Sequence, residues 1–380
     1  MAYLESKPRY ESLDGLRGVA ALMVASFHIL EIYATSPADQ IINHGYLAVD
    51  FFFLLSGYVT GYAYDDRLAS GKLTVRDFFK RRITRLHPML VMGITFGTLL
   101  FYFGALPTDD IIPLWQLLQS AVAALFMITL SPYFDIRSGV NYPPNGTAWS
   151  LACEYIANIL YALVVRHFPK VMLAVFVGLC ALLTIALGMN IDLWGLLKVR
   201  EYAAYTMIGG WGHTPTHIYI AASRLLYPFF MGLLLARLGK KISLRDGFLW
   251  CSLLLVALLA VPRIGTGEFG WTNGLYETLV VLVAFPLIVV AGAGSHIRGQ
   301  RTLALCKWLG AISYPLYITH FPIVLMLTSW KAAHPDAPLS VHIFMGISTF
   351  LLAVAVAYAS LKLYDQPVRK WLRQHWFAKN

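Results

Sequence analysis

The chain of 380 residues is 58% hydrophobic and only 13% charged, and it carries a formal net charge of +10 at pH 7. A pair of soluble domains does not need this much apolar surface, whereas apolar runs of about 17 to 22 residues are long enough to cross a hydrocarbon core of roughly 30 Å. These features predict an all-α, polytopic membrane helix bundle that forms a single domain over residues 1–380. Basic loops on one side of the membrane then explain the positive charge better than nucleic-acid binding does.

Ten apolar segments in chain order are predicted to span the membrane. They cover residues 16–34, 46–64, 88–105, 149–166, 171–188, 217–236, 247–262, 275–293, 306–328 and 341–361. An eleventh apolar stretch, 113–130, is predicted to be re-entrant or interfacial, because counting it as a span would put the basic loops 66–87 and 237–246 on opposite sides. Long outer loops are expected at 106–148 and 189–216, where function tends to sit.

Lysine and arginine are unevenly distributed among the predicted loops. If the N-terminus is cytoplasmic, 24 of the 30 lysines and arginines fall on inner segments and 5 on outer segments. Because positively charged loops stay on the cytoplasmic side, this asymmetry predicts that both termini are cytoplasmic. The four cysteines lie in or beside apolar segments, at spacings that match neither a zinc site nor a disulfide framework. We therefore expect no metal.

The first predicted span carries Asp14, Arg17 and His28 on one helical stripe. An 11-residue step from Arg17 to His28 returns to within roughly 20° of the same helix face. With a rise of about 1.5 Å per residue, His28 lies roughly 16 Å beyond Arg17, near the bilayer midplane if Arg17 marks the inner edge. A side chain of this kind faces protein or water rather than lipid.

Four further ionisable residues fall inside predicted spans in the outer half of the membrane, namely Asp50, Glu154, Arg224 and His320. Such groups are expensive in a bilayer and by default mark a polar cavity. A histidine beside carboxylates can act as a general base, because the ordinary pKa of histidine lies near neutral pH and a carboxylate can orient the ring. A hydrogen bond between helices or a proton relay would use the same side chains, and the residues alone leave these alternatives open.

A basic stretch, DFFKRRITRLHP at residues 77–88, is predicted on the inner side. Arg82 and Arg85 are three residues apart and share a helix face. Paired guanidinium groups are suited to phosphate oxygens, which they bind bidentately. The alternative is an ordinary basic anchor that touches anionic lipid.

Five motifs together resemble the acyltransferase 3 family of integral membrane acyltransferases. Arg17 and His28 match its pattern of Arg, ten residues and His, and the other similar segments are VDFFFLLSGY, RRITRLHP with its Arg-x-x-Arg, WSLACEY and SYPLYITH. The motifs run in the expected order from residue 12 to 322, so the resemblance covers essentially the whole chain. Because the chain ends soon after its last predicted span, it resembles the stand-alone form rather than the form fused to a periplasmic SGNH-type domain.

The resemblance implies acyl transfer, usually of acetyl from acetyl-coenzyme A as co-substrate, to a hydroxyl of a carbohydrate or related acceptor. We expect O-acetylation of a cell-surface glycan or a lipid-linked saccharide by an integral protein of a bacterial cytoplasmic (inner) membrane, in contact with membrane lipid. A longer acyl donor such as succinyl is also compatible. Neither nucleic acid nor a metal is expected as a partner, and the sequence gives no indication of oligomeric state.

Under this hypothesis His28 deprotonates the acceptor hydroxyl. Glu154 is the first choice as its orienting carboxylate, while Asp14, the third candidate catalytic residue, is expected rather to pair with Arg17 near the inner edge. Direct transfer and a covalent acyl-histidine intermediate both remain open.

The same hypothesis assigns the remaining candidate residues. Arg82 and Arg85 would bind donor phosphate, and Arg17 would be a further contact. Arg224 or Tyr314 would stabilise the oxyanion. The full set of candidate substrate-binding residues is Asp50, Arg224, Tyr314, Tyr317 and His320.

The principal rival is a proton-coupled transporter or flippase of a lipid-linked sugar, in which the histidine and carboxylates move protons. We detect no internal repeat and no Gly- or Pro-broken helices in matching halves, which disfavours this class. A scaffold or sensor that keeps the fold without chemistry is a third class, and it would tolerate alanine at His28.

Overall fold

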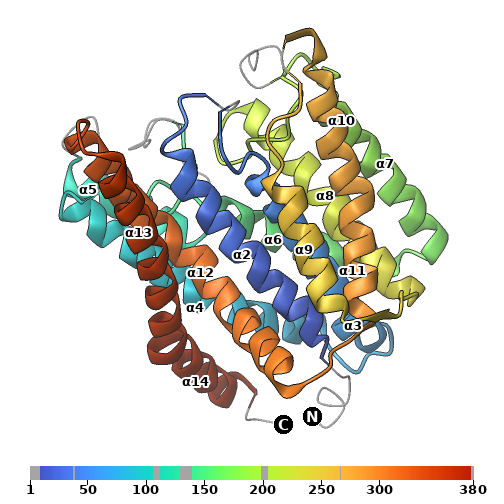
Figure 1. Ribbon diagram of the computed structural model, residues 1–380. Helices are drawn as coiled ribbons and strands as arrows, with labels where there is room; N and C mark the ends of the chain where they lie inside the picture. The colour runs from blue at the N-terminus through green and yellow to red at the C-terminus, as the bar shows by residue number, and fades with distance from the viewer. Residues whose placement is uncertain are drawn as a thin grey trace.

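The computed structural model describes residues 9–36, 39–105, 112–128, 139–197, 204–265 and 267–377. These residues form an almost entirely α-helical bundle, which confirms the predicted fold class (Figure 1). In the described part, the strands are limited to the two-residue β1 (Leu244–Arg245) and β2 (Ser295–His296), which pair in parallel. The long predicted loops lie partly outside the described residues, at 106–111, 129–138 and 198–203.

The helices have the following bounds in chain order: α2 Glu11–Glu31, α3 Ala48–Ala69, α4 Val75–Tyr102, α5 Leu114–Leu125, α6 Ala148–Leu163, α7 Lys170–Gly188, α8 Pro215–Leu238, α9 Gly247–Ala260, α10 Trp271–Leu279, α11 Phe285–Ala293, α12 Gln300–Ala333, α13 Leu339–Ser360 and α14 Gln366–Phe377. One π-helical turn, Val280–Ala284, joins α10 to α11, and another, Leu361–Asp365, joins α13 to α14. Single 3-10 turns occur at Gly45–Leu47, Val165–His167 and Gly267–Phe269.

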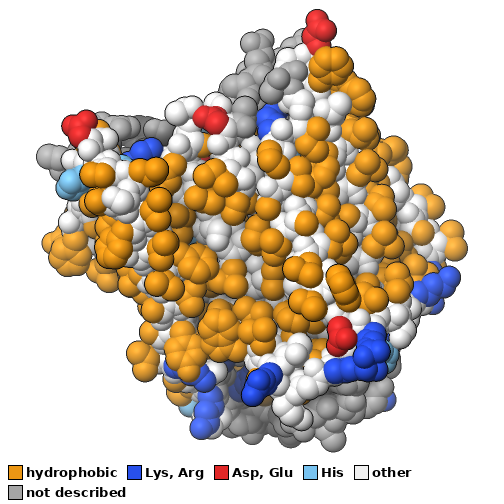
Figure 2. Space-filling model, in the orientation of Figure 1, with side chains coloured by type: hydrophobic (Ala, Val, Ile, Leu, Met, Phe, Trp, Pro, Cys, Tyr) orange, Lys and Arg blue, Asp and Glu red, His pale blue; other side chains and the backbone are white. Residues whose placement is uncertain are grey.

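Eight helical segments of the described chain are long and apolar enough to cross a membrane. Helices α6 and α9 occupy the other two predicted spans, with 16 and 14 residues. Apolar side chains cover the middle of the face shown in Figure 2, and lysine and arginine gather at one end. Helix α5 has 12 residues, too few for the roughly 20 that a crossing requires, in agreement with its prediction as a segment that does not span. The chain is therefore an integral membrane protein.

Two ends of the bundle are distinguished below. The basic end is where α2 and α12 begin and α14 lies, and the loop end is where α2 and α12 finish (Figure 1). Helix α2 is central, because it contacts α3, α9, α11, α12 and α13. Its stripe of ionisable residues therefore lies between packed helices and is only partly exposed.

The prediction of a loop over residues 66–87 is wrong at both ends, because α3 continues to Ala69 and α4 starts at Val75. Thr74 caps this helix, since its hydroxyl accepts a hydrogen bond of 3.0 Å from the amide of Asp77. Hydropathy alone does not detect a helix whose first three turns are charged. The basic stretch 77–88 is consequently a rigid helical surface on which Arg82 and Arg85 have fixed positions.

Glycines allow the helices around α2 and α3 to approach closely. A Cβ added to Gly57 of α3 would lie 1.8 Å from the carbonyl oxygen of Phe229 in α8, and one added to Gly232 of α8 would lie 2.1 Å from that of Leu54. A Cβ on Gly18 of α2 would lie 2.6 Å from the carbonyl oxygen of Leu309 in α12. Small residues at helix contacts let backbones meet in this way in membrane bundles.

Gly57→Ala is therefore expected to destabilise the protein by about 1–3 kcal/mol, because the new methyl group forces α3 and α8 apart. The matched control is Gly178→Ala in α7, where an added Cβ meets no atom within 4 Å. Thermal unfolding of the purified variants in detergent measures both effects. The close α3–α8 contact is contradicted if Gly57→Ala unfolds at the same temperature as Gly178→Ala.

Candidate active site

His28 lies in the last turn of α2, where its ring stacks on that of His320 in α12. The ring centroids are 5.5 Å apart and the planes differ by 26°. Nδ1 of His28 lies 3.0 Å from Oε2 of Glu31, one turn further along α2. A carboxylate can only accept, so Nδ1 donates and Nε2 carries the lone pair in the neutral ring. This is the arrangement in which a carboxylate orients a histidine base.

The predicted pairing of His28 with Glu154 is wrong. Glu154 of α6 instead accepts hydrogen bonds from Arg82 of α4 and from Ser56 of α3, the latter at 2.5 Å. Arg82 is almost completely buried, and a guanidinium in such a place requires a carboxylate partner. The spacing of three residues between His28 and Glu31 is the sequence signal that would have identified the carboxylate that contacts His28.

His320 is fully buried beside His28. Its Nδ1 donates to the carbonyl oxygen of Leu316 at 2.9 Å, so Nε2 is left as an acceptor, and it has no hydrogen-bond partner among the described residues. The Tyr317 hydroxyl lies 2.6 Å from the hydroxyl of Ser150, and the Tyr317 ring lies 6.1 Å from the His320 ring. Buried polar atoms are usually satisfied, so a buried nitrogen without a partner beside His28 is unusual.

The position of His320 depends on a proline in α12. Pro322 has no amide hydrogen, which leaves the carbonyl oxygen of Ile318 without its helical partner. The side-chain amide of Asn145 donates to this oxygen at 2.7 Å, and Thr147 donates to the carbonyl of Tyr317 at 3.3 Å. The described loop 139–147 is thereby fixed against α12 next to the two histidines.

Asp50 of α3 and Arg224 of α8 form a completely buried ion pair. Nη2 and Nε of Arg224 lie 2.6 and 3.1 Å from Oδ2 of Asp50. Arg224 also donates to the carbonyl oxygens of Gly209 at 2.9 Å and Tyr46 at 2.7 Å, and it lies over the ring of Trp149. These contacts hold the loop around Gly209 and give no support to the predicted oxyanion role of Arg224.

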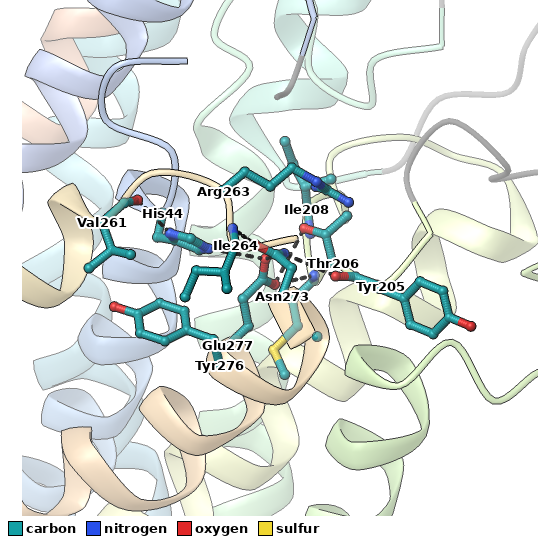
Figure 3. Close-up of polar contacts among 12 residues, drawn as sticks. His44, Tyr205, Thr206, Ile208, Val261, Arg263, Ile264, Asn273, Tyr276 and Glu277 are labelled. Carbon is teal, nitrogen blue, oxygen red and sulfur yellow. Dashed lines mark hydrogen bonds and ion pairs between the residues drawn. The ribbon is translucent and has the colours of Figure 1, made fainter. Parts of the chain in front are cut away.

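A second buried cluster at the loop end surrounds Glu277 of α10 (Figure 3). Glu277 accepts hydrogen bonds from the Tyr46 hydroxyl, from the amide of Met207 at 2.6 Å and from Asn273 at 2.6 Å. His44 lies between the carbonyl oxygen of Val261, 2.8 Å from Nδ1, and Oδ1 of Asn273, 3.1 Å from Nε2.

The Glu277 cluster and the Asp50–Arg224 pair hold the same loop, 204–212, because Glu277 accepts from the amide of Met207 and Arg224 donates to the carbonyl oxygen of Gly209. Tyr46 takes part in both groups. Sequence reasoning did not select Glu277 or His44. Glu277 falls inside the predicted span 275–293, so the criterion that selected Glu154 would have found it.

Toward the basic end, Arg17 of α2 is fixed to α12. It donates to Ser313 at 2.8 Å and to the carbonyl oxygen of Gly310 at 2.9 Å, and it pairs with Asp14 at 3.1 Å. The predicted Asp14–Arg17 pair is thus confirmed. Tyr314, one residue beyond Ser313, donates to the carbonyl of Leu86 in α4 at 2.6 Å and so links α12 to α4.

The two arginines of the Arg-x-x-Arg pattern differ in their surroundings. Arg82 is buried and bound to Glu154, whereas Arg85 is half-buried and forms no ion pair with an acidic side chain in the described chain. An uncompensated, partly buried guanidinium is a ready partner for an anion, so Arg85 rather than Arg82 is available to a ligand.

The site therefore has two chemically distinct ends. Two histidine rings with available nitrogen lone pairs lie toward the loop end, and arginines lie toward the basic end, roughly 16 Å away along α2. This arrangement suits a long ligand that carries anionic groups at one end and a reactive group at the other. Within the described residues, no group of three or more His, Cys, Asp or Glu side chains is placed to hold a metal ion.

Comparison with known proteins identifies similar chains. The family described as "Acyltransferase domain" matches residues 10–359. "Protein 2 in picA locus" of Rhizobium radiobacter is 35% identical over 164 residues, which are 40% of this chain and 81% of that protein. O-acetyltransferase OatA of Staphylococcus aureus strain NCTC 8325 is 25% identical over 381 residues, 96% of this chain. A putative O-acetyltransferase of strain COL is 26% identical over 392 residues, also 96% of this chain.

The chain spans only 58% of the length of these two staphylococcal proteins. No solved structure matches it.

Proposed function

The chain belongs to the membrane acyltransferase family whose domain covers residues 10–359, and from that membership we propose that it moves an acetyl group from acetyl-coenzyme A to a hydroxyl of a glycan or lipid-linked saccharide. The observation that carries the proposal is the pairing of His28 with Glu31, which leaves the second ring nitrogen of His28 free. The names of the staphylococcal relatives support acetyl as the group transferred.

In the proposed reaction, the hydroxyl oxygen of the acceptor attacks the thioester carbonyl while Nε2 of His28 takes the hydroxyl proton. The tetrahedral intermediate collapses with cleavage of the carbon–sulfur bond, and the imidazolium returns the proton to the departing thiolate. The products are an acetyl ester and free coenzyme A. Glu31 stabilises the imidazolium during this cycle, as a carboxylate does in other histidine-based acyl transfer.

His320 and Tyr317 bind the acceptor in this proposal. The unpartnered Nε2 of His320 accepts a hydrogen bond from an acceptor hydroxyl, which places the saccharide against the His28 ring. Tyr314 links the two helices on the donor side. Asp50 and Arg224 have a structural role in this proposal, because their polar atoms already bind each other and backbone carbonyl oxygens.

The donor enters from the basic end, where Arg85 and Arg17 bind its phosphates and Arg82 positions Glu154. The flexible arm of coenzyme A then reaches along α2 to His28. We assign the basic end to the cytoplasm of a bacterial cell, and both termini with it, because 24 of 30 lysines and arginines fall on predicted inner segments. The acceptor reaches the histidines from the loop end.

Glu31→Gln is expected to lower kcat on the order of 10- to 100-fold with little change in KM for donor or acceptor, because the amide stabilises the imidazolium less well. The effect is smaller than loss of the base itself, since Glu31 is partly exposed. Initial rates of acetyl transfer by purified protein in nanodiscs measure it. The control is Glu268→Gln, an exposed glutamate in the turn Gly267–Phe269, which should leave the rate unchanged. Equal rates for the two variants would contradict the assignment of Glu31.

A further inference from the structure

Helix α14 lies at one side of the basic end of the bundle and packs on α4 (Figure 1). The π-helical turn Leu361–Asp365 redirects the chain from α13 into α14, and it places Asp365 almost completely out of solvent. Asp365 pairs with Arg369, one turn further along, with 2.8 Å between Oδ1 and Nε. At the far end of α14 the ring of Phe377 lies 4.9 Å from the guanidinium of Arg81 in α4. Contacts at both ends thus fix α14 against the arginine-rich first turns of α4.

These contacts bring together three arginines from three helices. Arg81 faces Phe377, so Arg85, one turn along α4, lies on the side from which α14 arrives. The turn Leu361–Asp365 contacts α4 and α12, and α12 packs on α2, so Arg369, one turn further along, lies among the helices that carry Arg85 and Arg17. The cluster formed by Arg17, Arg85 and Arg369 is called the arginine cluster below.

The acidic side chains nearby neutralise the arginine cluster only in part. Asp14 pairs with Arg17 and Asp365 with Arg369, while Glu154 is taken by Arg82. No acidic side chain of the described residues forms an ion pair with Arg85. The cluster therefore keeps the positive charge of Arg85 uncompensated in a partly buried place, and an anion that bridges the arginines balances that charge.

We propose that Arg369 binds phosphate of the acyl donor, so that the C-terminal helix α14 forms one wall of the donor site. The inference rests on the proposed function and extends it to a helix outside the matched family domain, which ends at residue 359. Guanidinium groups bind phosphate oxygens bidentately, and arginines from three helices can hold a donor that carries several phosphate groups. The consequence is a preference for acyl donors with a phosphorylated nucleotide over donors with the same thioester and no phosphate.

The experiment compares two donors on the full chain in nanodiscs of phosphatidylcholine, which has no net charge. Acetyl-coenzyme A and S-acetylpantetheine carry the same thioester, but only the first has phosphate groups. Arg369→Gln is expected to raise KM for acetyl-coenzyme A about 10-fold, to leave kcat nearly unchanged and to leave KM for S-acetylpantetheine unchanged. Lys370→Gln removes the same charge from the next, exposed residue and should change neither KM.

Further variants separate binding from folding. Arg369→Gln leaves Asp365 buried without its partner, so the double variant Asp365→Asn/Arg369→Gln, which removes both charges, should show the same donor-specific shift. Arg369→Lys should recover part of the affinity. An equal rise in KM for both donors, or unchanged KM for acetyl-coenzyme A in both variants, would overturn the proposal.

Calorimetric titration of coenzyme A provides a readout that does not depend on catalysis. The wild-type chain should bind it about 10-fold more tightly than Arg369→Gln in phosphatidylcholine nanodiscs. If the wild type binds coenzyme A in this way but transfers no acetyl, the proposed function fails while the binding role of Arg369 stands. If the variant differs from the wild type only in nanodiscs with phosphatidylglycerol, the cluster binds lipid headgroups and the proposal is overturned.

Discussion

His28→Ala is expected to lower the rate of acetyl transfer by roughly 10²- to 10⁴-fold, the usual loss when a general base is removed. The fold should persist, because His28 is partly exposed and its hydrogen bond is made within the same helix. Release of free coenzyme A thiol by purified protein with a saccharide acceptor measures the rate.

His334→Ala is the matched control for His28→Ala. His334 also stacks on an aromatic ring at the loop end, that of Trp330, but it is exposed to solvent. Its replacement should leave the rate unchanged. A His28→Ala variant that keeps most of its activity would contradict the proposed base and would favour a chain that has kept the fold without this chemistry.

Arg224→Ala is expected to cost about 3–5 kcal/mol of stability, because it leaves the carboxylate of Asp50 buried without a partner. It also removes the hydrogen bonds to the carbonyl oxygens of Gly209 and Tyr46, so the loop 204–212 should loosen. Thermal unfolding in detergent, together with protease sensitivity of this loop, measures the two effects.

Two comparison variants sharpen this prediction. The double variant Asp50→Leu/Arg224→Met removes both charges and should recover part of the lost stability. Arg245→Ala removes one member of the exposed Arg245–Asp246 pair, whose side chains are 74% and 45% accessible, and should cost nothing measurable. If Arg224→Ala unfolds at the same temperature as Arg245→Ala, the buried ion pair does not hold the loop end together.

The membrane fold was largely predictable from the sequence, because hydrophobicity over about 20 residues depends on composition alone. Each of the ten predicted spans corresponds to a helix, although those at 149–166 and 247–262 are shorter than predicted. The start of α4 was not predictable from hydropathy, since its first turns are charged and are stabilised by the Thr74 cap and by contact with α14.

The candidate site was predictable in part. The stripe on α2 was correct, because helical periodicity places Arg17 and His28 on one face, and both meet α12. The partner of His28 was predicted wrongly, because the choice of Glu154 rested on depth in the membrane, which does not tell which helices are neighbours, and not on the three-residue spacing to Glu31. Glu154 instead pairs with the buried Arg82. These residues are 72 positions apart, so no local sequence pattern predicts their contact.

The most direct test of the account is to follow labelled acetyl through membranes that contain the chain. Acetyl-coenzyme A labelled in the acetyl group is supplied to the cytoplasmic side with the native glycan pool present, and alkali-labile acetyl ester is counted in the glycan fraction. We expect label with the wild-type chain and a loss of that label with His28→Ala. The proposed function fails if the folded wild-type chain transfers no label, and proton flux on addition of a lipid-linked sugar would then support a transporter.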